Sequence, residues 1–402
     1  MPSSISSSDP TGIAAVEPGQ GPNAHQGPLA PGLRLTASDR PGMAQPVSER
    51  DVPPLPWMKM ILIVFALVFL ITLAWEWHIR TLGFEPGDLG DEPSAWAEQR
   101  RRLDTGPVPV AIIGDSRILF DTDLDRFKQL TGVRPVQLAL AGTNARPVLE
   151  DVAASRFNGL LIVGITELSY YREGLGLGGK ALARGQWESP GQRVSFLIFR
   201  ALRRGLAMLD NDTSLSTSVL RRDEGWRKGA HGPYDDVWKL EVTGDDRQTG
   251  LWPAIEQNAY LRAHAIRMWM IIYGFPGPKP DVIAMTEART RAAVVKIRAR
   301  GGDVIFVRPP SASKLRAMEE ARLPRDKGWE ALLKTAQVKG VHFDDLPNAQ
   351  GLWLPELSHL HRSCALVFTD AYVRALTKIT PRLHLLARPL RTLEPRDCLG
   401  AS

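Results

Sequence analysis

Three short apolar runs in the first half of the chain constrain its fold more than any other feature. They read VPVAII at 108–113, VQLAL at 136–140 and LLIVGI at 160–165. Both faces of each run are apolar, which is typical of strands buried on both sides in a parallel sheet. Helical patterns at 123–130 and 146–154 separate the runs. This order predicts right-handed βαβ units.

The same alternation returns nearer the C-terminus. Helix, strand, helix, strand and helix are predicted, in this order, at 281–300, 304–307, 328–337, 341–343 and 363–376. We therefore expect an α/β fold with a doubly wound, parallel, five-stranded sheet, whose two parts span 108–167 and 281–380. A linker with one helix at 78–107 precedes it, and a C-terminal tail follows at 381–402.

The segment 168–280 interrupts this pattern. Its spacing is mostly helical, so we expect a helical insertion that is a lid over a site, a docking surface for another membrane protein, or a subdomain packed on the sheet. It holds five of the eleven tryptophans, namely Trp187, Trp226, Trp238, Trp252 and Trp269. A basic cluster in it suits either anionic lipid or glycan, or a solvated helix face, and comprises Arg200, Arg203, Arg204, Arg221, Arg222, Arg227 and Lys228.

A separate apolar run lies near the N-terminus. Met60–Trp75 holds sixteen residues without a charge, with Lys59 before it and Trp77 after it. A snorkelling lysine and interfacial tryptophans extend this run to about the 20 residues that cross a bilayer. Core helices are seldom apolar on every face, and a cleaved signal peptide would be followed by an A-x-A site. We therefore predict one transmembrane helix at 57–77.

The charges that flank this helix favour a cytoplasmic N-terminus. Arg34, Arg40, Arg50 and Lys59 precede it, whereas Arg80 follows it among acidic residues. The predicted localisation is the inner (cytoplasmic) membrane, single-pass, with the C-terminal domain extracytoplasmic. The segment 1–56 is rich in Pro, Gly and Ser and lacks aromatic residues, so we expect a disordered cytoplasmic tail.

Composition argues against several classes of partner and cofactor. The 50 basic and 44 acidic residues give a net charge of +6 that is spread along the chain, so we expect no nucleic-acid partner. The sequence shows no metal-ligand cluster, phosphate loop or dinucleotide fingerprint, and we expect no metal and no cofactor. Two cysteines do not make a disulfide scaffold. Cys364 is expected to be a small core residue, although pairing with Cys398 is feasible outside the cytoplasm.

Residues that follow the predicted strands carry the chemistry, because ligands of open α/β sheets bind beyond the carboxyl ends of strands. Ser116 follows the first strand, and His359 follows the last, with Glu356 three residues before it. A serine nucleophile needs a neighbouring base, and the base needs an acceptor that holds its tautomer. Ser116, His359 and Glu356 supply these three roles. The backbone amides of Ser116 and Gly142 are the expected oxyanion donors.

Other residues near the same edge are weaker candidates. The hydroxyl of Thr166 is a further oxyanion donor. Arg117, Asn144 and Arg308 are candidates for substrate binding, although the two arginines suit salt bridges at the rim equally well. Asp115 is expected to be a turn residue, and His342 and Asp344 are spare candidates near the last strand.

These residues resemble the pattern of the SGNH hydrolase superfamily, the GDSL-like lipases and esterases. The pattern has GDS after the first strand, a glycine after the second and an acidic-x-x-His element near the C-terminus. GGDVIFVRPP and PELSHLHRSCALVFTDAYVRAL look like the closing half of membrane-anchored SGNH-type proteins of the bacterial cell envelope. The resemblance covers Pro109–Ile165 and Asp281–Leu376. It implies a flavodoxin-like three-layer sandwich, with Ser116 as nucleophile and His359 as base.

Two departures from the family pattern concern the oxyanion site and the acid. The family has a GxND element after the third strand, whose asparagine is an oxyanion donor. The matching run here is Gly164-Ile165-Thr166-Glu167, which has threonine in its place, and Glu167 would bring a negative charge towards an oxyanion. Glu356 stands where an aspartate is usual, and its extra methylene changes reach and not chemistry.

The predicted function is a membrane-tethered SGNH-type serine esterase or O-acyltransferase that acts on acyl esters of an extracytoplasmic glycan or lipid. The alternative is a catalytically impaired SGNH-like binding module, or an accessory partner of a membrane-bound envelope acyltransferase. The replaced asparagine element motivates this alternative.

Overall fold

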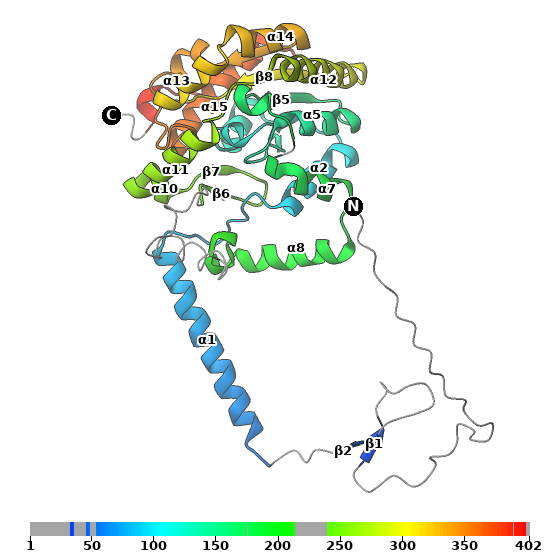
Figure 1. The fold of residues 1–402 in the computed structure, drawn as a ribbon, viewed down its shortest axis with the longest axis vertical. Helices are drawn as coiled ribbons and strands as arrows, with labels where there is room; N and C mark the ends of the chain where they lie inside the picture. Colours follow the sequence, from blue (N-terminus) through cyan, green and yellow to red (C-terminus); the bar gives the residue numbers. More distant parts are fainter. Residues whose placement is uncertain are drawn as a thin grey trace, which may run out of the picture. The chain divides into compact units, whose positions relative to one another are not determined.

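The computed structural model describes residues 54–174, 176–213, 239–388 and 390–398, and the backbone of two strands nearer the N-terminus (Figure 1). These strands, β1 (Leu33–Leu35) and β2 (Pro46–Ser48), pair antiparallel. The rest of the predicted disordered tail, through residue 53, lies outside the described residues. So do Trp226, Trp238 and the basic residues at 221, 222, 227 and 228.

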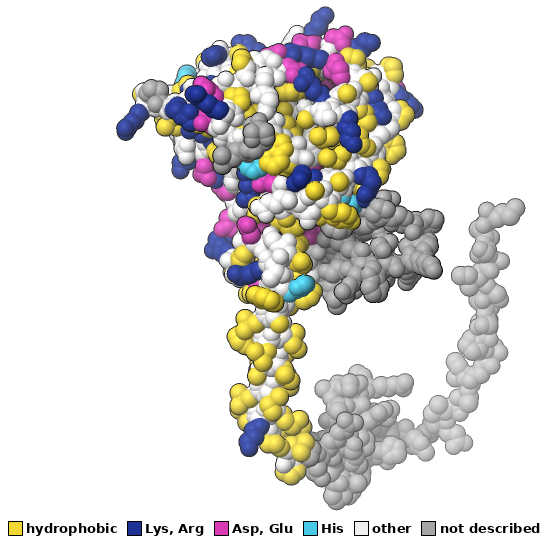
Figure 2. Space-filling model, turned by 90° about the vertical axis from the view of Figure 1, so that its left-hand side faces the viewer, with side chains coloured by type: hydrophobic (Ala, Val, Ile, Leu, Met, Phe, Trp, Pro, Cys, Tyr) yellow, Lys and Arg dark blue, Asp and Glu magenta, His cyan; other side chains and the backbone are white. Residues whose placement is uncertain are grey.

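One helix of the described chain, α1 (Trp57–Thr81), is long and apolar enough to cross a membrane. Figure 2 shows hydrophobic side chains along its length. The helix fits a single-pass anchor and continues beyond the predicted end at residue 77. The last turns of the helix pack on the domain. There the carboxylate of Glu76 accepts hydrogen bonds from the amides of Ala207 and Met208, both at 2.9 Å.

The central sheet has five parallel strands in the order β4-β3-β5-β8-β9. Their bounds are β3 (Val110–Ile113), β4 (Val136–Gln137), β5 (Leu160–Gly164), β8 (Asp303–Arg308) and β9 (Lys339–His342). Ile112 pairs with Ile162, which pairs in turn with Ile305. The predicted α/β class with five parallel strands is confirmed.

Helices cover both faces of this sheet (Figure 1). Val110 and Ile112 pack into one core with α4 (Leu124–Thr131) and α15 (Arg362–Ile379). Ala111 and Ile113 pack into the other with α2 (Pro93–Thr105), α5 (Ala145–Ala154) and α12 (Pro280–Ala299). Because alternate residues of one strand enter different cores, the strands are apolar on both faces.

Several short helices were not predicted. They are α3 (Ser116–Phe120), α6 (Glu167–Tyr170) and α13 (Ser313–Arg322). The first two are too short for a periodic pattern, and α13 buries only Leu315 and Glu319, so its apolar stripe is minimal. The helix predicted at 328–337 is a π-helical turn (Asp326–Glu330) that continues as α14 (Ala331–Ala336). Short 3₁₀ turns lie at 176–178, 207–209, 211–213, 343–345, 347–349 and 395–397.

The insertion is partly helical, as predicted, but it also contains a strand pair. Its helices include α7 (Gly179–Gln186), α8 (Pro190–Arg203), α10 (Pro253–Gln257) and α11 (Ala259–Ile272). The strands β6 (Glu241–Thr243) and β7 (Thr249–Leu251) pair antiparallel. Each has three residues, too few for a clear alternating pattern in the sequence.

A disulfide joins Cys364 of α15 to Cys398. This corrects the expectation that Cys364 is only a small core residue. The pairing is feasible because the C-terminal segment returns along the domain, where Leu386 donates its amide to the carbonyl of Leu130 at 2.8 Å. The bridge closes a loop with a sequence separation of 34. A chain-entropy model gives such a loop about 4 kcal/mol of stabilisation.

Two glycines let α3 pack directly against the strands. A Cβ atom on Gly164, at the end of β5, would lie 2.3 Å from Cβ of Ile118. A Cβ atom on Gly114 would lie 2.2 Å from Cγ2 of the same residue. Ile118 is fully buried, so a larger residue at either position would displace α3 and with it Ser116, its first residue.

We predict that Gly164→Ala destabilises the domain by about 1–3 kcal/mol, because the added methyl overpacks the contact with Ile118. Thermal unfolding of the full chain in detergent measures the effect. Gly106→Ala is the matched control, since a Cβ atom there meets nothing within 4 Å. Equal melting temperatures for the two variants would contradict the prediction.

Candidate active site

Ser116, His359 and Glu356 meet in space although 243 positions separate the serine from the histidine. Ser116 begins α3 directly after β3, and Glu356 and His359 lie in the loop that precedes α15. The Nε2 atom of His359 lies 2.8 Å from Oγ of Ser116. Its Nδ1 atom lies 2.8 Å from Oε1 of Glu356. If Nδ1–H donates to the carboxylate, Nε2 is free to accept the serine proton.

The carboxylate of Glu356 is held by four donors. Besides the imidazole, the amide of His359 donates to Oε1 at 2.7 Å and the amide of Ser358 donates to Oε2 at 3.2 Å. The indole Nε1–H of Trp269 also donates to Oε2. Glu356 and His359 are both fully buried, so these bonds replace the water that the charged group loses.

Trp269 belongs to α11 of the insertion and was not predicted as a site residue. Its ring meets the His359 ring edge-on, with centroids 5.6 Å apart. Phe120 of α3 packs against the imidazole from another side, with centroids 4.4 Å apart. Both contacts fix the orientation of the imidazole. No local motif marks Trp269, and the only signal in the sequence is the tryptophan content of the insertion.

A cavity of about 590 Å³ lies beside Ser116. Its lining includes Asp115, Phe120, Gly142, Asn144, Trp269 and Tyr273, and the charged residues Asp91, Arg203, Asp210, Lys239 and Glu241. The insertion thus supplies much of the wall. The size is that of a small-molecule site.

The carboxyl groups of the cavity are shielded from water to different degrees. Burial raises the pKa of Glu241 to about 8, and the repulsion of Asp91 and Asp88 adds to this. Burial likewise raises the pKa of Asp115, which caps α3 by accepting the amide of Arg117 at 3.1 Å. The expectation that Asp115 serves the turn agrees with this bond.

Two of the three expected oxyanion donors line the cavity. Ser116 is the first residue of α3, where a backbone N–H has no acceptor within the helix. Gly142 lies in the turn after β4 with a φ of 61°, a conformation that favours glycine. Thr166 is buried at the start of α6 and is not among the cavity-lining residues, so the third expected donor is not brought together with the other two.

Arg117 and Arg308 are buried in ion pairs and are not among the residues that line the cavity, which agrees with the salt-bridge alternative for both, although they are buried and do not lie at a rim. Arg117 pairs with Glu319 and donates to Oγ of Ser358 at 3.1 Å. Arg308 pairs with Glu319 and with Glu167, both at 2.9 Å. The negative charge of Glu167 is therefore neutralised by Arg308 and does not face the cavity.

Asn144 does line the cavity, but its side chain is engaged with the backbone. Its Oδ1 atom accepts the amide of Arg146 at 2.9 Å, which caps α5. Its Nδ2 atom donates to the carbonyl of Arg172 at 2.5 Å. Asn144 therefore shapes the wall beside Ser116.

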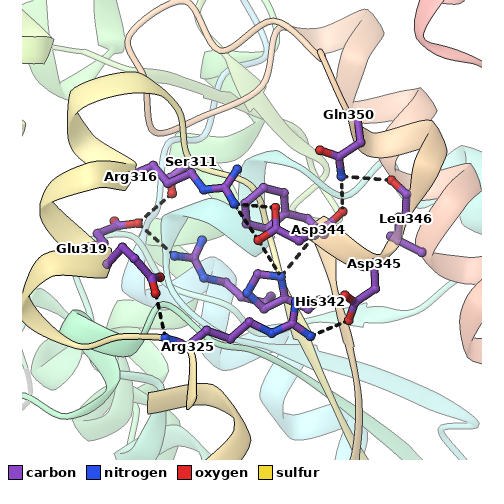
Figure 3. A network of polar contacts seen from close by, with 12 residues as sticks. Ser311, Arg316, Glu319, Arg325, His342, Asp344, Asp345, Leu346 and Gln350 are labelled. Carbon is purple, nitrogen blue, oxygen red and sulfur yellow. Dashed lines mark hydrogen bonds and ion pairs between the residues drawn. The ribbon is translucent and has the colours of Figure 1, made fainter. Parts of the chain in front are cut away.

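His342 and Asp344 belong to a separate polar network at the end of β9 (Figure 3). The Nδ1 atom of His342 accepts the amide of Asp344 at 3.1 Å, and Asp344 pairs with Arg316 at 2.6 Å. Burial lowers the pKa of His342 to about 3, and the cations Arg308 and Arg325 act in the same direction. The imidazole is thus neutral near pH 7 and lies outside the group of Ser116.

Glu319 is the acidic centre of the buried ion pairs. Burial alone would raise its pKa, but Arg117 and Arg308 outweigh burial and lower it to about 2. Oγ of Ser311 also donates to the carboxylate at 2.7 Å. The folded state therefore holds this group as an anion even in acid.

We predict that the free energy of unfolding falls in acid in two stages. The pKa of His342 is about 3 when folded and near 6.5 when unfolded, so the unfolded chain takes up this proton first, below about pH 6.5. The pKa of Glu319 is about 2 when folded and near 4.5 when unfolded, so a further loss begins below about pH 4.5. Urea unfolding between about pH 7 and 3 measures both stages.

Glu319→Gln should remove the lower stage. Glu320→Gln, at the exposed neighbour on α13, is the control and should keep it. The same slope of stability against pH in both variants would refute the assignment.

Comparisons with known proteins do not assign the chain to a family. No family model matches it, and no curated protein matches it. Among the residues that the structure describes, no cluster of three or more His, Cys, Asp or Glu side chains could hold a metal ion. The interpretation of the site therefore depends on its geometry.

Proposed function

We propose that the chain is a membrane-tethered serine esterase or O-acyltransferase of the SGNH type, acting on acyl esters of a glycan or lipid outside the cytoplasm. The observation that carries the proposal is the hydrogen-bonded group of Ser116, His359 and Glu356 beside a cavity of about 590 Å³. Serine, base and acid within hydrogen-bond reach of one another are the signature of an activated nucleophile.

The arrangement of the strands supports the same assignment. The order β4-β3-β5-β8-β9 is that of flavodoxin-like sheets, in which ligands bind where the strand order reverses. Ser116 follows β3 and Gly142 follows β4, so both lie at this switch point. These are the positions at which the SGNH pattern places its nucleophile and its oxyanion glycine.

In the proposed mechanism, Oγ of Ser116 attacks the ester carbonyl while Nε2 of His359 takes the serine proton. The amides of Ser116 and Gly142 donate to the oxyanion, and Glu356 stabilises the imidazolium. The imidazolium then protonates the leaving alkoxide, which gives an acyl-serine. Water deacylates it in an esterase and an acceptor hydroxyl does so in an acyltransferase, with His359 again taking the proton.

A catalytically impaired binding module, or an accessory partner of a membrane-bound acyltransferase, is the second candidate. It is favoured by Thr166, which is not among the residues that line the cavity and leaves two expected oxyanion donors there. One missing donor costs about 3 kcal/mol of transition-state stabilisation. The intact contacts of His359 favour the enzyme.

We predict that Ser116→Ala and His359→Ala each lower hydrolysis of p-nitrophenyl acetate by about 10⁴-fold or more, because either change removes the activated nucleophile. The assay uses the full chain in detergent. A fluorophosphonate probe should label the wild type and not Ser116→Ala. Ser195→Ala, at an exposed serine of α8, is the control and should be labelled normally.

Two milder variants test the roles of Glu356 and Trp269 in the proposed mechanism. Glu356→Gln should retain the fold and lose most activity, whereas Trp269→Phe should lose about tenfold, since it removes one donor to Glu356 and keeps the ring contact. No labelling of a well-folded wild type would exclude the enzyme in favour of the binding module.

The proposal places the α/β domain outside the cytoplasm. The basic residues before α1 favour this orientation, and the disulfide between Cys364 and Cys398 suits an oxidising compartment. The substrates within reach are then esters of the envelope.

We predict that alkaline phosphatase fused after Ser402 is active and that green fluorescent protein at the same position is not fluorescent. Alkaline phosphatase matures outside the cytoplasm, because it needs disulfides. The reverse result would invert the topology and exclude envelope esters as substrates.

A further inference from the structure

Helix α8 turns an apolar face outward. Its exposed side chains recur at helical spacing as Val194, Leu197, Ile198, Ala201 and Leu202, and the four larger ones are 49–57% exposed. Soluble domains seldom expose a continuous apolar face of this kind without a partner.

The opposite face of α8 accounts for the packing on the domain. Phe196, Phe199 and Arg200 are half-buried, and Arg203 is buried. Arg203 donates to the carbonyls of Leu89 at 2.6 Å and Leu209 at 3.0 Å. Because this face is fixed to the domain, the apolar face stays exposed among the residues that the structure describes.

The C-terminal end of α8 is linked by hydrogen bonds to the C-terminal end of α1 and to the residues that follow α1. Arg80 donates to the carbonyl of Gly205 at 3.0 Å, and the amide of Gly87 donates to the carbonyl of Arg203 at 2.7 Å. Glu76 accepts the amides of residues 207 and 208, as described above. These contacts hold α8 beside the end of the apolar run of α1, where Trp75, Trp77 and Arg80 lie.

The orientation of α8 also suits a membrane surface. In Figure 1 it lies at the side of the domain where the last turns of α1 join it, and it runs crosswise to those turns. Arg193 and Arg204 border the apolar face, with side chains 55% and 60% exposed. Helices that lie in the bilayer interface have an apolar face of this kind with basic residues at its edge.

We propose that α8 is an interfacial helix whose apolar face rests in the bilayer that α1 crosses. The occupant of the face is lipid acyl chain, because α8 is held next to the membrane end of α1. This inference depends on the proposed anchoring by α1 and not on the ester chemistry.

The test uses lipid-resident quenchers and single cysteines in the full chain. The two native cysteines are joined to each other, so an added cysteine is the one that reacts with a fluorophore. Val194→Cys reports on α8, and Val295→Cys is the matched control, since the two valines are 55% and 56% exposed. Val295 lies on α12, at the opposite end of the domain in Figure 1. Phe65→Cys reports on α1.

In vesicles of brominated phosphatidylcholine, we expect fluorescence at positions 65 and 194 to fall at least twofold more than at position 295. Equal quenching at 194 and 295, with position 65 quenched, would overturn the proposal and leave the anchor intact. A blue shift at 194 without quenching would assign the face to a protein or a second copy, and would also overturn it. No quenching at 65 would refute the anchor itself. Ester hydrolysis is not a readout, so failure of the proposed chemistry is seen separately.

Discussion

The buried carboxylate of Glu319 holds together the edge of the sheet on which the candidate site is built. Its partners come from the ends of different strands, with Arg117 after β3 and Arg308 at the end of β8. Arg308 also binds Glu167, which follows β5. A buried charge that loses its partner costs about 3–5 kcal/mol, so these groups must stay together. Arg117 also donates to Ser358, which lies next to His359 in the loop before α15. This bond couples the position of Ser116 to that of His359.

The insertion completes the site from the other side. Trp269 donates to Oε2 of Glu356 and packs against His359, and Lys239 and Arg203 also line the cavity. The insertion therefore forms part of the cavity wall. Of the three roles expected for it, this is closest to a lid over a site.

The sequence predicted the parts of this protein that local patterns encode. Strands such as Leu160–Gly164 are apolar on both faces, and Ser116 and His359 follow strands in the positions that open sheets use for ligands. The role of Arg117 was not predictable, because a guanidinium beside a nucleophile suits a substrate as well as a buried carboxylate. Arg117 meets a buried carboxylate because Glu319 lies beside it in the fold. Glu319 is about 200 positions away in the sequence, and its helix, α13, has almost no apolar stripe. Trp269 was missed for the same reason, since its hydrogen bond joins segments that share no local pattern.

Arg203 links two properties of the molecule. It is the last residue of α8, it holds that helix to the domain, and it lines the same cavity as Ser116. With α8 on the bilayer as proposed, Ser116 stays at a fixed height above the membrane. Encounter with an ester carried by the same membrane then becomes a search in two dimensions, at an effective concentration in the millimolar range. Under the proposed ester chemistry, tight binding of a membrane ester would not be needed, and a soluble ester would be a poor measure of the rate at the membrane.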